Sequence, residues 1–269
     1  MKPLVSKFWR YLKLYTHFIK LSVMEVVIYR ANSLLLGITP IVWMATTIIF
    51  ISVIFRGTKE IGGWSFWEIM LLLGIHELIF LGTWMIFADN LEKFVQDVRQ
   101  GTFDRVLIRP ANHRFLVSFS SLDFTSIGSL VNTIVVLSVS LSHLTIETSI
   151  TQFLSFLVSL FCGWLLVYFI YFSLSSLSLF FVNAETFVDW LLEATDFDRY
   201  PADIYSNLFR FFLLFFLPIL FFAYVPTAIL LNKLPSYYAL LGVVMVAWFY
   251  LISTLIWRAG LKKYQSASS

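Results

Sequence analysis

The residues with the clearest capacity for chemistry are a histidine and two carboxylates within apolar stretches. His76-Glu77 begins like the zinc-protease pattern H-E-x-x-H, in which two histidines one helical turn apart hold the metal. Phe80 stands where the second histidine would be, so the helical ligand pair is missing. The single cysteine, Cys162, provides neither a disulfide nor a Cys-based metal site. We therefore expect no metal site and no cofactor in this chain.

Glu77 and Asp123 each interrupt a run of apolar residues. A charged side chain is costly in hydrocarbon, so such groups face protein, water or each other. We expect these two carboxylates to make a polar contact inside a helical bundle. A proton or ion relay and a satisfied buried pair both account for that contact. A hydrolase built on His76, Glu77 and Asp123 would lack a nucleophile, and we therefore expect no catalytic residues.

The composition indicates that the segments around these residues lie in a membrane. Of 269 residues, 59% are hydrophobic and only 13% are charged, whereas roughly a quarter of an ordinary soluble domain is charged. This excludes a secreted domain, a cytosolic enzyme and a disordered protein. No G-x-x-x-x-G-K-[ST] motif is present, so the chain has no nucleotide-binding loop of that kind. The basic residues are spread over several segments, which argues against nucleic acid as a partner.

We expect a single all-α membrane domain over residues 1–269 with six transmembrane helices, because a span needs about 20 apolar residues. The apolar runs are 33–55, 66–87, 115–141, 150–181, 208–231 and 237–257. An even number places both termini on one side. With the N-terminus inside, 16 of the 19 Lys and Arg residues lie on the inner side, and only Arg56, Lys59 and Lys233 lie outside. This positive-inside bias predicts an inner (plasma) membrane protein with cytoplasmic termini, including the tail 258–269.

Residues 1–30 are predicted to form an amphipathic helix at the membrane interface. Tyr15, Ile19 and Val23 recur at helical spacing, whereas Lys13 and Lys20 fall elsewhere on the helix. A long cytoplasmic start of the first span is the alternative.

The inner loop 88–114 has its own amphipathic pattern. Its apolar residues fall at i, i+3, i+4 and i+7, at Leu91, Phe94, Val95 and Val98. We expect a short helix that ends at Gly101, followed by a mixed-charge stretch closed by Pro110. A loop that only joined two spans could be much shorter. The length and charge therefore favour a docking surface, although a helix lying on lipid headgroups would show the same pattern.

Two further segments are unusual. The inner segment 183–207 carries six acidic residues, and anionic lipid repels such charge, so we expect it to stand in water or to meet a basic partner. The fifth span contains Pro218 and Pro226, which break or kink a helix toward its outer end. That break is a candidate outer gate, and an ordinary proline-kinked helix is the alternative.

Four motifs follow one another along the chain. They are Gly101-x-Phe103-Asp104-x-x-Leu107-Ile108-Arg109-Pro110, Arg199-Tyr200-Pro201-x-Asp203-Ile204-Tyr205, the Pro218 and Pro226 pair, and Trp257-Arg258-x-Gly260-Leu261-Lys262-Lys263-Tyr264. In this order they resemble the bacterial type-2 ABC transporter permeases, in the subfamily of formerly uncharacterised transport permeases. The resemblance covers practically the whole chain.

The resemblance implies the membrane subunit of an ABC exporter that pairs with a second permease copy, often a related but different chain, and with separate ATPase subunits that bind ATP and Mg. A homodimer and a heterodimer both fit this resemblance. The loop after span two would be the coupling helix that contacts the ATPase. The resemblance also implies a re-entrant segment near the outer face, which includes Pro218, Tyr224 and Pro226. The residues that it makes candidates for ATPase contact are Glu92, Asp97, Arg99, Asp104, Arg105 and Arg109.

The main alternative is a proton- or ion-coupled secondary transporter that uses Glu77 and Asp123. The 29 Phe, 9 Trp and 12 Tyr residues suit an apolar or amphipathic cargo, but aromatic side chains that face lipid would explain the same count.

Overall fold

The computed structural model describes residues 13–24, 28, 30–124, 127–181 and 184–264, and the elements named within these residues are all helices. Three of the helices are long and apolar enough to cross a membrane, namely Phe66–Arg99, Ile150–Leu179 and Tyr237–Lys263. They coincide with the second, fourth and sixth predicted spans. Shorter apolar helices cover Ile38–Ile54, Ser129–His143 and Asn207–Phe216.

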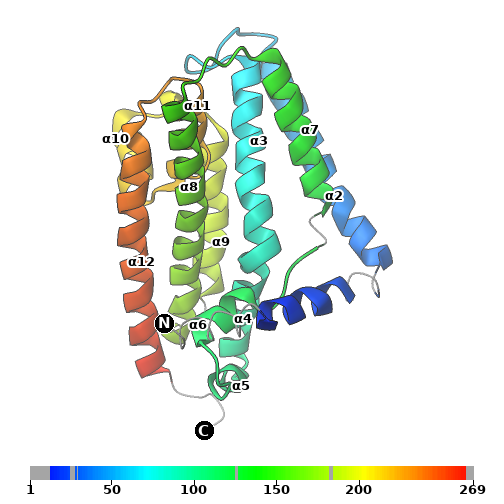
Figure 1. Cartoon of the computed structure of the whole chain (residues 1–269), viewed down its shortest axis with the longest axis vertical. Coiled ribbons are helices and arrows are strands. Elements are labelled where there is room, and N and C mark those ends of the chain that lie inside the picture. Colours follow the sequence, from blue (N-terminus) through cyan, green and yellow to red (C-terminus); the bar gives the residue numbers. More distant parts are fainter. Residues whose placement is uncertain (1–12, 25–27, 29, 125–126, 182–183, 265–269) are drawn as a thin grey trace.

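The long helices run side by side along the longest axis of the molecule (Figure 1). They are α2 (Arg30–Ile54), α3 (Phe66–Thr83), α7 (Ile127–His143), α8 (Ile150–Ser176) and α12 (Tyr237–Lys263). Helix α8 packs mainly on α12, while α3 and α2 both pack on α7. We call the end that carries α4, α5 and α6 the lower end of the bundle. The opposite end, with the loop 55–65, is the upper end.

At the lower end, α3 continues through a π-helical turn, η1 (Trp84–Ala88), into α4 (Asp89–Arg99). Two short helices follow, α5 (Asp104–Leu107) and α6 (His113–Phe119). The predicted end of the amphipathic helix is confirmed, because Gly101 has a φ of 71°, which glycine adopts readily. We call residues 89–119 the α4–α6 unit.

The third predicted span, 115–141, is wrong at its start. The structure divides it into α6 and α7, with residues 120–124 in no regular helix. The backbone N–H of Asp123 donates to Met85 O at 3.0 Å instead of continuing a helix. The interruption lets the chain leave the α4–α6 unit and enter the bundle as α7.

The fifth predicted span, 208–231, does not cross the bundle. Near its start Arg210 pairs with Asp203, and just after its end the Lys233 ammonium donates to Gly63 O at 2.8 Å. Both contacts lie at the upper end. The segment therefore enters and leaves at the same end, as the resemblance to the permeases implied for a re-entrant segment.

The structure breaks this re-entrant segment into short pieces. They are α10 (Asn207–Phe211), the π-helical η5 (Phe212–Phe216), the 3-10 turn η6 (Ile219–Phe221) and α11 (Tyr224–Leu230). Residues 219–230 are buried against the rest of the chain. Irregular backbone at this depth is tolerated where protein surrounds it.

The acidic segment 183–207 was expected at one end, but its described part runs between the two ends. Glu185 pairs with Arg99 at the lower end, Asp198 lies beside His76 halfway along α3, and Asp203 accepts a hydrogen bond from Trp64 at the upper end. Its elements are α9 (Glu185–Ala194), η3 (Thr195–Arg199) and η4 (Ala202–Ile204). Hydropathy missed this passage because its charges are neutralised by distant parts of the chain.

The N-terminal segment is described from residue 13, and residues 1–12 and 25–27 of the predicted interface helix lie outside the described residues. Residues 13–24 are helical and lie crosswise to the bundle at its lower end (Figure 1). The Ser22 hydroxyl accepts a hydrogen bond from the Leu122 N–H at 2.9 Å, which fixes this helix to the non-helical stretch 120–124. Residues 265–269 of the predicted tail also lie outside the described residues.

Candidate functional site

The α4–α6 unit is held to the bundle by the apolar face of α4. Leu91, Phe94 and Val95 are all but completely buried, as the sequence pattern predicted. The Phe94 ring meets the Trp257 ring of α12 edge to face, with centroids 5.6 Å apart. Burying a side chain of this size stabilises a fold by about 1.5–3 kcal/mol. The inner face of α4 is therefore part of the core.

A second aromatic side chain extends this contact beyond α4. Phe103 is fully buried, with its ring centroid 5.1 Å from that of Phe94 and 5.3 Å from that of Tyr264. Burial and the neighbouring carboxylate of Asp104 raise the pKa of the Tyr264 phenol above its usual value. The start of α5 thus contacts the last described residue of the chain, directly after α12.

Asn90 fastens the base of α4 to the turn before α7. Its amide nitrogen donates to the carbonyl oxygens of Ile86 and Ser121, at 3.1 and 2.8 Å. Its amide oxygen accepts from the hydroxyls of Ser120 and Ser121 and from the Ser121 N–H. A buried amide with this many partners is satisfied and holds both segments in one geometry.

Arg114 fastens α6 to α8 and α12. Its guanidinium carbon lies 4.2 Å from the centre of the Phe172 ring, and its terminal nitrogens donate to Ser253 and Thr254 at 2.9 and 3.1 Å. Cation–π contact of a desolvated guanidinium is worth about 2 kcal/mol. All parts of the α4–α6 unit are thus tied to the long helices.

The six residues predicted to contact an ATPase divide into two groups. Glu92 accepts from the Tyr171 hydroxyl at 3.0 Å, Asp97 accepts from the Thr102 hydroxyl at 2.6 Å, and Arg99 pairs with Glu185 at 2.8 Å. Together with Asp104, these residues have partners within the chain.

The remaining two, Arg105 and Arg109, are exposed, and within the described residues neither forms an ion pair. Between them lies Ile108, whose exposed fraction is 82%. An isolated exposed isoleucine is ordinary, but here two unpaired cations flank it on a rigid support. These three residues form the outward face of the unit.

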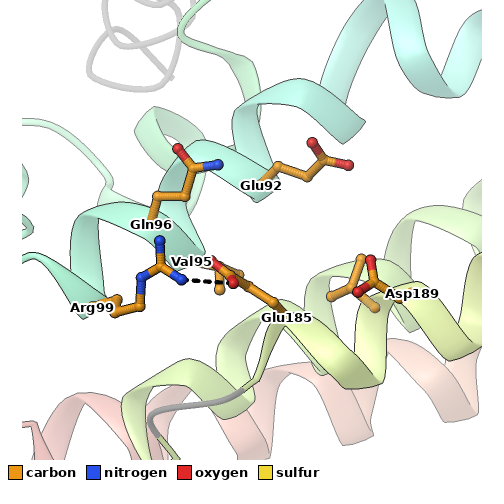
Figure 2. A pocket seen from close by; sticks show the side chains of 7 residues that line it. Glu92, Val95, Gln96, Arg99, Glu185 and Asp189 are labelled. Atoms are coloured by element: carbon orange, nitrogen blue, oxygen red, sulfur yellow. Dashed lines mark hydrogen bonds and ion pairs between the residues drawn. The ribbon is translucent and has the colours of Figure 1, made fainter.

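A hollow of about 270 Å³ separates α4 from α9. Glu92, Gln96 and Arg99 line one side, and Glu185 and Asp189 line the other (Figure 2). The Arg99–Glu185 pair closes the hollow on one side, and both side chains are more than 40% exposed. Three carboxylates against one guanidinium make the hollow acidic.

Glu77 and Asp123, the two carboxylates predicted to lie within the membrane, are not brought together. Glu77 lies on α3, whereas the backbone of Asp123 bonds Met85, eight residues further along the same continuous helix. Eight residues correspond to about 12 Å along a helix. A direct relay between Glu77 and Asp123 is therefore not present in this structure.

His76 has partners that the sequence did not indicate. Its Nε2 lies 3.3 Å from the Nε of Arg199, and its Nδ1 lies 3.6 Å from a carboxylate oxygen of Asp198. Because the guanidinium donates, Nε2 accepts, which assigns the proton to Nδ1. In the sequence, the sign of this cluster is that Asp198 and Arg199 lie together in one short charged stretch.

Asp198 also fixes the re-entrant segment. Its two carboxylate oxygens accept from the backbone N–H groups of Ala223 and Tyr224, at 2.7 and 3.0 Å, where α11 begins. A carboxylate is favourable at a helix N-terminus because the first N–H groups have no partner within the helix. Asp198 is completely buried and so holds the innermost part of this segment.

The candidate gate residues lie in this buried segment. The backbone dihedral angles of Leu217 are not helical, so the helix ends directly before Pro218. This confirms the predicted break. Pro226 lies in the first turn of α11, where a missing N–H has no helical partner to lose. The Tyr224 hydroxyl donates to Asp203 at 3.1 Å. A role in gating stays a prediction.

Comparison with known families agrees with this architecture. A model of the family described as ABC-2 family transporter protein matches residues 41–268. That range includes the α4–α6 unit, the segment 184–204 and the re-entrant segment. Comparisons with curated proteins and with solved structures found no match. The resemblance carried by the sequence motifs is therefore confirmed, and the chain belongs to the ABC-2 transporter family as a type-2 ABC transporter permease.

Proposed function

We propose that this permease is the membrane subunit of an ATP-driven exporter and that the α4–α6 unit couples it to a separate ATPase. In this proposal the chain crosses the membrane six times, through α2, α3, α7, α8, the segment 185–204 and α12. Both termini and the lower end face the cytoplasm of a bacterial cell. ATP and Mg would be bound by the partner ATPase, and a second permease, a related but different chain, would complete the transport path.

One observation carries the proposal. The outward face of Arg105, Ile108 and Arg109 stands on a unit whose inner side is fixed to the long helices α8 and α12. Arg114 connects it to both helices and Phe94 contacts α12, while α4 itself continues α3 through η1. Asn90 ties α4 to the end of α6. A displacement applied to this face would therefore move several helices together. A loop lying on lipid headgroups would not need these connections.

The predicted contact residues have different roles in this proposal. Arg105 and Arg109 would pair with acidic side chains of the ATPase, since cations at a rim guide association and fix its register. Glu92, Asp97, Arg99 and Asp104 would support the surface from within, because their partners lie in the same chain.

The test is affinity purification of the tagged permease from membranes, with and without Arg105→Glu. We expect the unaltered chain to recover an ATPase and a second permease, identified by mass spectrometry. Reversing the charge of Arg105 should reduce the recovered ATPase and its ATP hydrolysis by about tenfold, because loss of 1.4 kcal/mol of binding is a tenfold change.

Arg56→Glu is the matched control, because Arg56 is exposed on the loop at the upper end. It should leave recovery of the ATPase unchanged. Equal recovery and equal ATP hydrolysis for Arg105→Glu and the unaltered chain would contradict coupling through this face. Recovery of the permease alone in several detergents would contradict the ABC assembly itself.

A further inference from the structure

A second cavity lies halfway along the bundle, where α2, α3 and η3 meet. It encloses about 360 Å³. Its walls include three aromatic side chains and three charged ones, namely Trp43, Phe80, Trp84, Glu77, Asp196 and Arg199. Pockets with apolar walls and a few fixed charges are the usual form of a small-molecule site. Ionisable side chains at this depth in a membrane protein generally mark a functional path.

The positive charge in this cavity already has partners. The Arg199 Nε lies 3.3 Å from His76 Nε2 and 3.3 Å from a carboxylate oxygen of Asp196. The guanidinium carbon is also 5.8 Å from the centre of the Trp43 ring. Arg199 is therefore stabilised without a ligand.

The Glu77 carboxylate shares the same cation, because the Arg199 guanidinium that attracts it electrostatically already pairs with Asp196. Within the described residues, no hydrogen bond or ion pair reaches its carboxylate, although the side chain is only partly exposed. With His76 neutral, the two carboxylates of the cavity outnumber its one guanidinium. The cavity therefore favours a cation.

The walls restrict the kind of cation. A metal ion would require several oxygen ligands around one point, and the described residues contain no group of three or more His, Cys, Asp or Glu side chains that could hold one. The lining of the cavity instead includes the aromatic side chains of Trp43, Phe80 and Trp84. Aromatic faces attract organic cations, with a gain of about 0.5–2 kcal/mol for each contact. Trp43 has an exposed fraction of 58%, so the cavity is bordered by a side chain on the outer surface of α2. An amphipathic molecule could reach it from the lipid.

We propose that this cavity binds an amphipathic organic cation, with Glu77 as its counter-charge and Trp43 and Trp84 as its aromatic walls. The proposal rests on the proposed transport function, since it names the class of cargo. The acidic character of the cavity and its aromatic walls support it independently of any partner subunit.

The test compares two probes of the same shape and opposite charge, tetraphenylphosphonium and tetraphenylborate. Binding is measured to the purified full-length chain, with whatever subunits accompany it, in lipid nanodiscs without ATP. We expect saturable binding of tetraphenylphosphonium with quenching of tryptophan fluorescence. Glu77→Gln should weaken that binding about tenfold or more, as loss of roughly 1.4 kcal/mol implies.

Two further variants separate binding from folding. Glu193→Gln is the matched control, because Glu193 is exposed on the neighbouring α9 and does not line the cavity. It should bind tetraphenylphosphonium like the unaltered chain. Trp43→Leu removes a largely exposed ring and should weaken binding severalfold without loss of folded protein, which size-exclusion chromatography would verify.

Tighter binding of tetraphenylborate than of tetraphenylphosphonium would overturn the proposal, as would an unchanged affinity in Glu77→Gln. Absence of saturable tetraphenylphosphonium binding to the folded chain would also overturn it, and would favour Glu77 as a contact for a second permease. These results are independent of whether an ATPase is recovered with the chain. A failure of the proposed cation binding can therefore be distinguished from a failure of the proposed coupling to an ATPase.

Discussion

Two regions of this permease interrupt its long helices, and they are built in opposite ways. The α4–α6 unit at the lower end buries one face and presents charged side chains on the other. Residues 219–230 of the re-entrant segment are buried on all sides. An interruption with one free face can receive a partner, whereas a fully enclosed one fixes the internal geometry of the subunit.

The difference extends to the interactions that hold each region. The α4–α6 unit is tied mainly by side chains, such as Asn90 and Arg114, that reach across to neighbouring elements. The re-entrant segment is held by the Asp198 carboxylate and, in addition, by close approach of its backbone to that of α8. A Cβ built on Gly163 of α8 would stand 2.4 Å from the carbonyl oxygen of Phe221. Only glycine at position 163 allows the backbone of α8 and the backbone of the re-entrant segment to come so close.

The largest effect should follow from Gly163→Ala. The added methyl group would meet two backbone carbonyl oxygens, at 2.4 and 2.8 Å, which cannot rotate away. We expect destabilisation of about 1–3 kcal/mol or more, despite the better helix propensity of alanine. Thermal unfolding in detergent would measure it. Gly57→Ala is the control, since the nearest atom to its added methyl would be 3.7 Å away; equal melting temperatures for the two variants would disprove the close approach.

A smaller and more local effect is expected for Asn90→Ala. The change removes every bond between the Asn90 amide and residues 120–121, and leaves buried partners unsatisfied at a cost of about 1–3 kcal/mol. Hydrogen exchange should become faster over residues 86–99, while residues 224–230 keep their protection. Gln96→Ala, at an exposed position on the same helix, should alter neither region. Faster exchange in both regions would show that the two are not independent.

The smallest effect should come from the Arg99–Glu185 pair at the edge of the acidic hollow. Both side chains are more than 40% exposed, and exposed pairs typically contribute less than about 1 kcal/mol. A double-mutant cycle with Arg99→Ala and Glu185→Ala should give a coupling energy in that range, reduced further by salt. A coupling energy of several kcal/mol would instead mean that this pair is a main connection between α4 and α9.

The sequence predicted those parts of the fold that depend on local patterns. The apolar stripe of α4 and its end at Gly101 follow from helical periodicity and from the conformational freedom of glycine. The break at Pro218 follows from the missing N–H of proline. Three long apolar helices followed from hydropathy alone. Each of these features is determined by residues within the same helix or next to it in the sequence.

The parts that could not be predicted depend on distant partners. Asp203 is neutralised by Trp64, Tyr224 and Arg210, and two of these lie well apart from it in the sequence. A prediction from hydropathy therefore makes the segment around Asp203 a loop and the apolar residues 208–231 a span. The cavity beside Glu77 was missed for the same reason, because α2, α3 and η3 form it together.

The passage of segment 185–204 through the bundle has a consequence for biogenesis. Asp and Arg at the centre of an inserting helix are disfavoured by about 2.5–3.5 kcal/mol each on translocon scales. This segment carries Asp198 and Arg199 and would not insert alone. His76 and Trp64, which lie against Arg199 and Asp198 and against Asp203 respectively, are synthesised earlier and can already be in place when it leaves the ribosome. We expect its insertion to wait for α3, so that the topology of this subunit is completed by assembly rather than by hydrophobicity of each segment in turn.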